Sequence, residues 1–255
     1  MKIPILGIKI NQINLGETIH QINKWTVSDD QHYIVTVNPE FIVATQKNKE
    51  FKNVLNLADI ATCDGIGLVY AARFLLKKKL IRVTGVELTK KLLNYQLSNN
   101  NYQINSKFQK PNFKIYLLGG KNNSVKILRQ KYPNKIVGAK MGGKIDMASW
   151  TLADNNEIIN NINISGANIL LVGFGQIKQE MWIFHNLDQL PNIKAAIGVG
   201  GTFDYLSGQV SRAPSWIRKI GLEWLFRLIR EPKRFKRILN AVIIFPWLVI
   251  KNKIS

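Results

Sequence analysis

The chain has 255 residues, 46% of them hydrophobic and 20% charged, and its 36 Lys and Arg against 16 Asp and Glu give a formal net charge of +20. This composition excludes collagen-like, coiled-coil and disordered low-complexity chains, and the length fits one large domain or one domain with an appendage. The charge argues against an enzyme of neutral small molecules. It predicts an anionic partner: nucleic acid, a membrane surface or a phosphorylated substrate.

Short apolar runs alternate with segments of helical periodicity along the first 200 residues. Strands are predicted at residues 5–10, 32–37, 59–63, 113–118, 136–139, 168–172 and 194–199. Helices are predicted at residues 15–27, 39–48, 66–76, 86–98, 124–132, 152–161 and 178–187, and a polar surface loop at 98–110. Several runs, such as IYLL and ILLV, are apolar throughout, as expected of strands buried on both faces. The alternation predicts an α/β fold with a mostly parallel sheet.

The pattern changes after residue 200. Residues 212–255 contain 11 basic and 2 acidic side chains and so carry +9 of the net charge. Glu223 and Arg227 stand four residues apart on one side of a predicted helix, and Pro232 suits the first turn of a second helix. Pro246 is expected to kink or end that second helix. We therefore divide the chain into an α/β catalytic domain, residues 1–200, and a helical basic C-terminal appendage, residues 201–255.

The longest apolar run covers residues 238–250 and contains Asn240 and Pro246. A helix of that length spans roughly 20 Å, against about 30 Å for the hydrocarbon core of a bilayer. The run is therefore too short to cross a membrane alone. Heavy use of Lys, Asn and Ile indicates AT-rich coding, as in a small bacterial or an organellar genome such as that of a plastid.

The sequence shows no metal-binding pattern. Its single cysteine, Cys63, excludes an intramolecular disulfide and a cysteine-based zinc site. There is no Asp-x-Asp, and the three histidines are scattered. We expect no metal and no cofactor, so the charge of a diphosphate leaving group would have to be offset by arginine, lysine and backbone N–H groups.

Polar and glycine residues follow five of the predicted strands, where ligands bind in open α/β sheets. These segments are Thr36-Val-Asn38, Cys63-Asp64-Gly65, Leu118-Gly119-Gly120, Gly173-Phe-Gly175 and Gly198-Val-Gly200. Any one glycine cluster is either a phosphate cradle at a helix N-terminus or a tight turn. None matches the G-x-G-x-x-G or G-x-x-x-x-G-K-[ST] motifs. Several clusters on one sheet edge nevertheless favour a nucleotide site.

Asp64 is the most informative polar residue because it stands where a strand ends and a helix begins. It either caps that helix or acts as a general base at the mouth of the site. Asn38 is either a turn residue ahead of Pro39 or a ligand for a sugar or base. Glu87 forms a capping-box pattern with Thr84 and is read as structural. Arg82 lacks an obvious local partner and is therefore a better ligand candidate.

Taken together, these segments resemble the WecG/TagA/CpsF family of glycosyltransferases over about residues 3–237. The matching pieces are VNPEFIVATQ (37–46), CDGIGLVYAAR (63–73), RVTGVEL (82–88), IYLLGG (115–120), LLVGFGQIKQEMWI (170–183) and GVGGTFDYLSGQVSRAPSWIRKIGLEWLFRLIREPKRFKR (198–237). Two departures stand out. The family usually has proline where this chain has Ile177, which puts the loop at the donor site in question, and aspartate where it has Glu87.

The resemblance implies an inverting, metal-independent transfer of a sugar from a UDP-sugar. The acceptor it implies is an N-acetylglucosamine-diphosphate-polyprenyl lipid in cell-surface polysaccharide or teichoic acid synthesis. The donor sugar is N-acetylmannosamine-like, with its uronic acid or glucose as alternatives. The implied fold is a Rossmann-like sheet with helices on both faces. The appendage would complete the active site and associate with an anionic membrane, giving a cytoplasmic, peripheral protein at the inner membrane face.

The same resemblance implies roles for individual residues. Asp64 is similar to the family's catalytic base, and the expected substrate-binding residues are Thr36, Asn38, Arg82, Gln179, Glu180 and Arg212. Weaker candidates for diphosphate or membrane contact are Gly119, Gly120, Arg218, Arg227, Arg230, Lys233 and Arg234. Self-association is left open, since Trp182, Trp216 and Trp224 suit either a core or an interface.

Two other classes of function compete with this one. A nucleic-acid-binding module fits the charge, but no recognised motif is present and the densest charge adjoins an apolar run, so we expect no nucleic acid partner. A basic membrane-surface scaffold without catalytic activity is the non-enzyme alternative. The acidic residue at position 64 argues against it.

Overall fold

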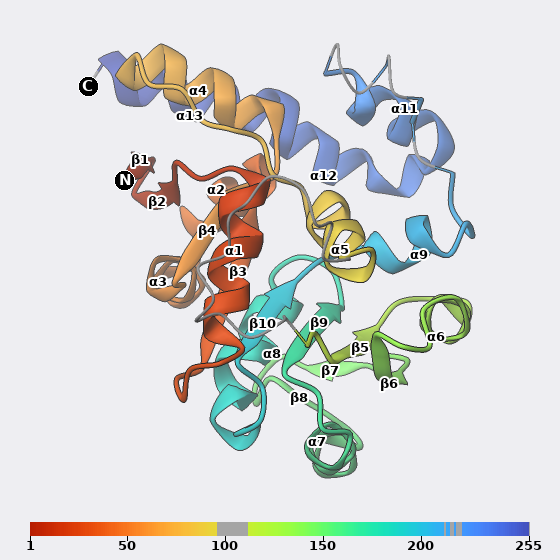
Figure 1. Ribbon diagram of the computed structural model, residues 1–255. Helices are drawn as coiled ribbons and strands as arrows, with labels where there is room; N and C mark the ends of the chain where they lie inside the picture. The colour runs from red at the N-terminus through yellow and green to blue at the C-terminus, as the bar shows by residue number, and fades with distance from the viewer. Residues whose placement is uncertain (96–111, 212, 215–216, 218–220, 255) are drawn as a thin grey trace.

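The computed structural model describes residues 1–95, 112–211, 213–214, 217 and 221–254. Its centre is a sheet of six strands, all parallel, in the order β4-β3-β10-β9-β5-β6 (Figure 1). The strands are β3 (His32–Val37), β4 (Ile60–Cys63), β5 (Ile115–Gly119), β6 (Ile136–Lys140), β9 (Ile169–Gly173) and β10 (Ala195–Gly198). The predicted parallel α/β sheet is confirmed.

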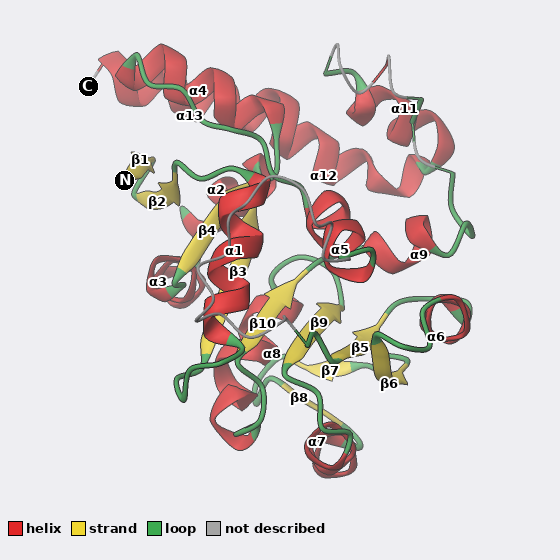
Figure 2. Cartoon of the chain, viewed as in Figure 1, coloured by secondary structure: helices red, strands yellow, loops and turns green. Residues whose placement is uncertain are grey.

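Helices cover both faces of this sheet, which makes the fold a Rossmann-like, three-layer sandwich (Figure 2). One face carries α2 (Pro39–Thr45), α3 (Lys49–Leu57), α4 (Ile66–Leu76), α7 (Asn155–Ile164) and α8 (Lys178–Asn186). The other carries α1 (Leu15–Trp25), α5 (Gly85–Leu93), α6 (Ser124–Lys131) and α9 (Thr202–Leu206). Alternate strand residues serve the two cores, Val35 one and Ile34 the other. This double burial explains why the strands are apolar throughout.

The N-terminus differs from its prediction. Residues 5–10 were expected to form one strand, but the chain forms a hairpin of β1 (Lys2–Ile5) and β2 (Ile8–Asn11). Leu6 and Gly7 make the turn with φ of 48° and 83°. Two successive residues with positive φ are the geometry of the tight turns that match strand twist, and Gly7 was the only sequence signal for it.

Other elements were also not predicted, among them helix α3 and two short strands. Helix α3 was missed because Asn48, assigned to the end of the preceding helix, caps a new one by accepting a hydrogen bond from Phe51 N–H at 2.9 Å. The short strands β7 (Ile145–Asp146) and β8 (Thr151–Leu152) pair antiparallel with each other. The predicted loop at 98–110 lies outside the described residues.

The C-terminal segment contains α11 (Glu223–Arg230), η2 (Pro232–Arg234), α12 (Phe235–Leu239), η3 (Asn240–Ile244) and α13 (Phe245–Ile254). Pro246 does not end the continuous helical stretch of α12, η3 and α13. The reason is that η3 is a π-helical turn in which Phe245 N–H donates to Asn240 O. Widening the turn accommodates a residue that has no N–H and whose ring collides with the carbonyl four residues back. Helix α13 lies along α4 and also contacts α2 (Figure 1).

The division at residue 200 stays a proposal. Helix α9 packs on α5 and α6, and its Phe203 is fully buried in the core. This contact favours a boundary after Leu206.

Trp182, for which either a core or an interface position was predicted, is a fully buried core residue. Within the described part of the chain, every helix is too short or too polar to cross a membrane.

Candidate active site

Two adjoining cavities lie beyond the carboxyl ends of the strands. The first, of about 460 Å³, is lined by the loops after β5, β9 and β10 and includes Gly120, Gly175 and Gly200. We call it the glycine cavity. The second, of about 380 Å³, lies between α4 and the C-terminal helices and is called the appendage cavity. Asp64, Asn38, Val86, Arg227, Arg234 and Arg237 line both.

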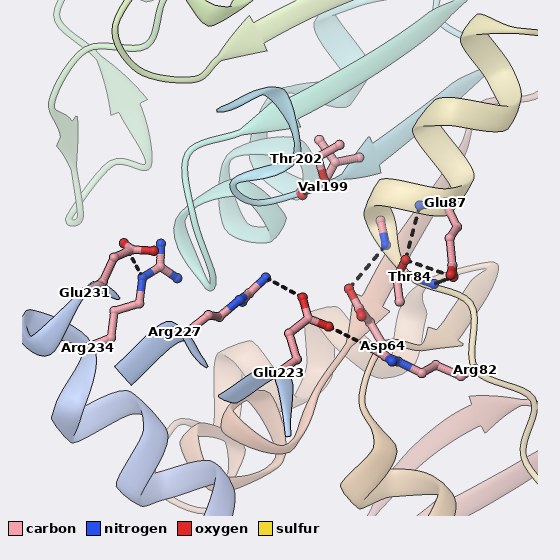
Figure 3. Close-up of polar contacts among 11 residues, drawn as sticks. Asp64, Arg82, Thr84, Glu87, Val199, Thr202, Glu223, Arg227, Glu231 and Arg234 are labelled. Atoms are coloured by element: carbon pink, nitrogen blue, oxygen red, sulfur yellow. Dashed lines mark hydrogen bonds and ion pairs between the residues drawn. The ribbon is translucent and has the colours of Figure 1, made fainter. Parts of the chain in front are cut away.

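Asp64 stands at the junction of the two cavities. Its Oδ2 accepts a hydrogen bond from Gly85 N–H at 3.2 Å, at the start of α5 (Figure 3). The residue before α4 is Gly65, and no side chain caps that helix. The interpretation of Asp64 as an N-cap is therefore wrong. Its carboxylate is presented to the cavities, held by the N-terminus of a different helix.

The pKa of Asp64 is raised because burial disfavours the ionised form. Arg82, Gly85 N–H and Arg227 act in the opposite direction and favour the carboxylate, while Glu223 adds to the rise. A carboxylate that is partly desolvated is a stronger proton acceptor than one in water. These surroundings suit a general base.

Arg82 does have a partner, and it comes from the appendage. Its Nη2 lies 3.1 Å from Glu223 Oε2, and Glu223 Oε1 lies 3.4 Å from Arg227 Nη2 (Figure 3). The second contact joins residues four apart on one side of α11, as the spacing of Glu223 and Arg227 allows. The guanidinium of Arg227 also stacks over the ring of Tyr205, 5.2 Å from its centroid. The carboxylate of Glu223 thus ties the core to α11 beside Asp64.

Two further arginines of the appendage face both cavities. Arg234 Nε pairs with Glu231 Oε2 at 2.6 Å. Arg237, which the sequence did not single out as a site residue, pairs through Nε with Glu40 Oε2 at 2.8 Å and donates to Gln176 Oε1 at 3.2 Å. Arg237 therefore fastens the appendage to α2 and to the loop after β9.

Thr36 and Asn38 both line the glycine cavity, and both also serve the fold. Thr36 Oγ1 donates to Gly198 O at 2.9 Å, joining β3 to β10. Asn38 caps α2, because its Oδ1 accepts from Phe41 N–H at 3.0 Å. Asn38 has the extended backbone expected ahead of Pro39, but it caps a helix and does not lie in a turn. Its contact with substrate stays a prediction. Thr84 and Glu87 form the expected capping box at α5.

Gln179 and Glu180 lie beneath the loop that follows β10. Gln179 Oε1 accepts from Gly200 N–H at 2.8 Å and its Nε2 donates to Glu180 Oε1 at 2.6 Å. Gln179 lines the glycine cavity, but Glu180 lines neither cavity. Burial raises the pKa of Glu180 to about 8, and its Oε2 has no hydrogen-bond partner among the described residues. In this structure Glu180 therefore positions Gln179, which in turn holds the loop at Gly200.

The loop at Gly119 and Gly120 requires glycine. Gly119 has φ of +110°, and a Cβ there would lie 2.7 Å from the backbone of Gly173. Gly120 has φ of +77° and lines the glycine cavity. The glycines therefore allow two sheet-edge loops to approach each other at the cavity wall.

Ile177 precedes α8 with φ of 68° and ψ of −55°. A β-branched residue rarely adopts a positive φ, and proline cannot, because its ring fixes φ near −65°. The loop at the glycine cavity is therefore shaped differently from one with proline at this position. The departure noted from the sequence has a structural consequence.

Some candidate residues are not brought to the site. Arg230 lies over the ring of Phe226, and neither Arg230 nor Lys233 lines either cavity. Arg212 and Arg218, and with them Trp216, lie outside the described residues. The sequence analysis also missed residues that do line the glycine cavity, namely Lys121, Lys178, Asp204 and Tyr205. Lys121 directly follows the motif IYLLGG and Lys178 lies within LLVGFGQIKQEMWI, so proximity to a glycine loop was the available signal.

A carboxylate between two cavities suits a reaction that joins two substrates, one held in each. The arginines that act on this carboxylate, Arg82 and Arg227, suit a donor whose leaving group is a phosphate ester. No group of three or more His, Cys, Asp or Glu side chains converges in the described parts of the chain. Fold and site together define a group-transfer enzyme.

Comparison with known proteins specifies the class. The model of the glycosyl transferase WecG/TagA/CpsF family matches residues 3–255, and the chain belongs to this family. Among curated proteins it is similar to N-acetylglucosaminyldiphosphoundecaprenol N-acetyl-beta-D-mannosaminyltransferase of Staphylococcus aureus strain MW2, with 29% identity over 258 aligned residues, 99% of this chain and 93% of the relative. The protein of the same name from strain NCTC 8325 / PS 47 matches to the same extent. The resemblance inferred from the motifs is confirmed.

Proposed function

We propose that this glycosyltransferase moves N-acetylmannosamine from its UDP-sugar to an N-acetylglucosamine-diphosphate-polyprenyl lipid, in cell-surface polysaccharide or teichoic acid synthesis. The observation that carries the proposal is the position of Asp64, which lines both cavities. The printed name of the Staphylococcus aureus relatives supports the acceptor and the sugar. UDP-glucose and the uronic acid of UDP-N-acetylmannosamine are the alternative donors.

The two cavities differ in the chemistry of their linings, and a nucleotide-sugar donor and a lipid-linked acceptor require such a difference. The glycine cavity is lined by glycine loops, Lys121 and Lys178, which suit a nucleotide diphosphate. The appendage cavity is lined by Ile66 and Tyr70 of α4 and by apolar residues of the C-terminal segment, namely Trp224, Ile238, Ala241 and Val242. It therefore suits an acceptor that carries a lipid. We assign the donor to the first cavity and the acceptor to the second.

The reaction we propose is a single in-line displacement. The acceptor hydroxyl oxygen attacks the anomeric carbon while Asp64 takes its proton, and the bond from that carbon to the diphosphate oxygen breaks. UDP leaves from the opposite face, so the anomeric configuration inverts. Arg227, Arg234 and Arg237 supply positive charge where negative charge develops, which is the work a metal ion does in other transferases.

A joint face of α4 and α13 supports association with an anionic membrane surface. Tyr70 and Phe74 of α4, Trp247 and Ile250 of α13 and Ile243 of η3 are exposed. Two lysines contact the aromatic residues of this face: Lys253 Nζ lies 3.8 Å from the centroid of the Phe74 ring and Lys251 Nζ 5.3 Å from that of Trp247. Three more, Lys77, Lys78 and Lys79, directly follow α4 in the chain. Exposed aromatic side chains beside lysines are suited to a lipid interface, and each lysine near an anionic surface contributes about 1 kcal/mol.

The donor is tested by offering the purified chain three UDP-sugars with a short-chain lipid-diphosphate N-acetylglucosamine. The donors are UDP-N-acetylmannosamine, its uronic acid and UDP-glucose. Mass spectrometry of the product is expected to show the mass of an added N-acetylhexosamine only with the first donor. The yield is expected to be unchanged by a chelator. Transfer from another donor would select an alternative, and no transfer from any of them would overturn the proposal.

The membrane face is tested by vesicle flotation. The wild-type chain is expected to float with vesicles that contain anionic lipid and to remain below with neutral ones. The double variant Phe74→Ala with Trp247→Ala should bind more weakly. Ile164→Ala is the matched control, because Ile164 is an exposed apolar residue on the distant helix α7. Equal flotation of the wild-type chain, the double variant and the Ile164→Ala control would show that this face does not bind the membrane.

A further inference from the structure

The carboxylate of Glu223 occupies an unusual position for an acidic residue of a basic segment. Its side chain is 14% exposed and bridges two arginines, Arg82 of the core at 3.1 Å and Arg227 of the same helix at 3.4 Å. Both arginines act electrostatically on Asp64. Glu223 also lines the appendage cavity, which Asp64 shares. A negative charge therefore lies among the cations that the proposed reaction requires.

The arginine pair has capacity for a larger anion than one carboxylate. Arg82 Nε is buried and has no hydrogen-bond partner among the described residues. The contact between Glu223 and Arg227 is at the long end for a charged pair, at 3.4 Å. A diphosphate has more acceptor oxygens and more charge than a carboxylate, so it can satisfy the donors that Glu223 leaves unused.

From this geometry we infer that Glu223 is a built-in counter-ion of the diphosphate site, which holds Arg82 and Arg227 while the site is free and competes with the substrate diphosphate for them. The inference rests on the proposed function, since it assumes a diphosphate substrate within reach of Arg227, the arginine of this pair that lines both cavities. Asp64, Glu223, Arg82 and Arg227 carry charges that sum to zero. A diphosphate that enters displaces the carboxylate from the arginines, and the returning carboxylate favours release of the diphosphate product.

Glu223 has a second effect, on the proton acceptor. The groups that face Asp64 are Arg82, Arg227, Glu223 and the N–H of Gly85. Of these, Glu223 raises the pKa of Asp64, whereas the other three lower it. Removing the charge of Glu223 therefore lowers that pKa. The acid limb of the kcat/KM profile, where the base becomes protonated, should move to lower pH.

The test is the affinity of Glu223→Gln for UDP and for inorganic diphosphate, measured by titration calorimetry at low salt. Loss of one negative charge beside the site is expected to lower Kd about tenfold for both probes. Glu223→Asp keeps the charge and should bind with the wild-type Kd. Glu157→Gln is the control for net charge, because Glu157 is 65% exposed and pairs with Lys140 away from the cavities. It should leave Kd unchanged.

The outcomes separate this inference from the proposed function. If the wild-type chain binds UDP but Glu223→Gln binds it equally or more weakly, the inference is overturned and the proposed function stands. If the wild-type chain binds neither probe, both are overturned. Glu223→Ala removes the carboxylate without putting an amide in its place, and it should also lower Kd for both probes. It replaces Glu223→Gln in the test if the Gln variant does not fold. An acid limb that does not move would also count against the inference, since a purely structural role leaves the base untouched.

Discussion

The α/β core and the C-terminal appendage contribute to the same two cavities but are held together in different ways. The core is a sheet with fully buried apolar residues on both faces, and it presents Asp64 through the backbone of β4 and α5. The appendage is anchored by the buried side chains of Phe245 and Val249. Its helix α11, in contrast, has no buried residue and reaches the core through the ion pair of Glu223 with Arg82 and the contact of Arg227 with Tyr205. The core thus fixes the position of Asp64, while charged contacts position Arg227.

This difference has a physical reason. Burial of apolar side chains is indifferent to ligand charge, whereas an ion pair is exchanged readily for another anion. A segment that, as we infer, releases its arginines to a diphosphate and recovers them afterwards is better held by ion pairs. The following substitutions test the two halves of the comparison separately.

The largest effect is expected for Asp64→Asn. The amide keeps the shape and can still accept from Gly85 N–H, but it cannot take a proton. Loss of a general base costs about 10²- to 10⁴-fold in rate, so kcat should fall by that factor. Product formation is followed by mass spectrometry, with folding checked by thermal unfolding. Wild-type activity would end the assignment of Asp64 as the base.

A smaller effect is expected for Arg227→Gln in the appendage. A hydrogen bond to a charged group contributes about 1.5–3 kcal/mol, so kcat/KM should fall roughly tenfold to a hundredfold. Arg230→Gln is the matched control, since Arg230 belongs to the same helix but lines neither cavity. Its kcat/KM should stay close to that of the wild type. Equal losses in the two variants would mean that only the overall charge of the appendage matters.

The smallest effect concerns the buried carboxyl group of the core, Glu180. Its pKa is raised by burial to about 8, above the ordinary value near 4.3, so the folded chain binds more protons than the unfolded chain between those values. The free energy of unfolding should therefore fall as pH rises through this window and level off above about 8. Glu180→Gln has no such proton and should show a shallower fall.

Urea unfolding at several pH values measures this difference. The control is Glu157→Gln, because Glu157 is exposed and distant from the glycine loop. It should keep the wild-type slope between pH 5 and 8. A slope in Glu180→Gln equal to that of the wild type would show that Glu180 is ionised in the folded chain.

The sequence predicted those features that depend on local patterns. Residues 32–37 and 66–76 were assigned with the bounds that the structure shows, because one is a continuous apolar run and the other a helix preceded by glycine. The capping box of Thr84 and Glu87 was likewise readable from a spacing of three residues. The family, too, could be inferred from motifs in chain order.

Contacts between distant parts of the chain could not be predicted in this way. The alternative that Asp64 caps the next helix was excluded only by its bond to Gly85, 21 residues further on. The partner of Arg82 lies 141 residues away in the sequence. The role of Arg237 depends on the fold of α2 and of the loop after β9. Spacing rules address neighbours on one helix or strand, and these pairs share neither.

The order of the site's parts along the chain has a consequence for synthesis. The last strand of the sheet ends at Gly198, whereas the arginines that face the cavities, Arg227, Arg234 and Arg237, follow later. Because chains fold from the N-terminal end as they are made, the sheet and its base can form on the ribosome before the counter-charges have been translated. A nascent or C-terminally clipped chain would then be folded but inert, and sugar transfer would begin only once the arginines have docked.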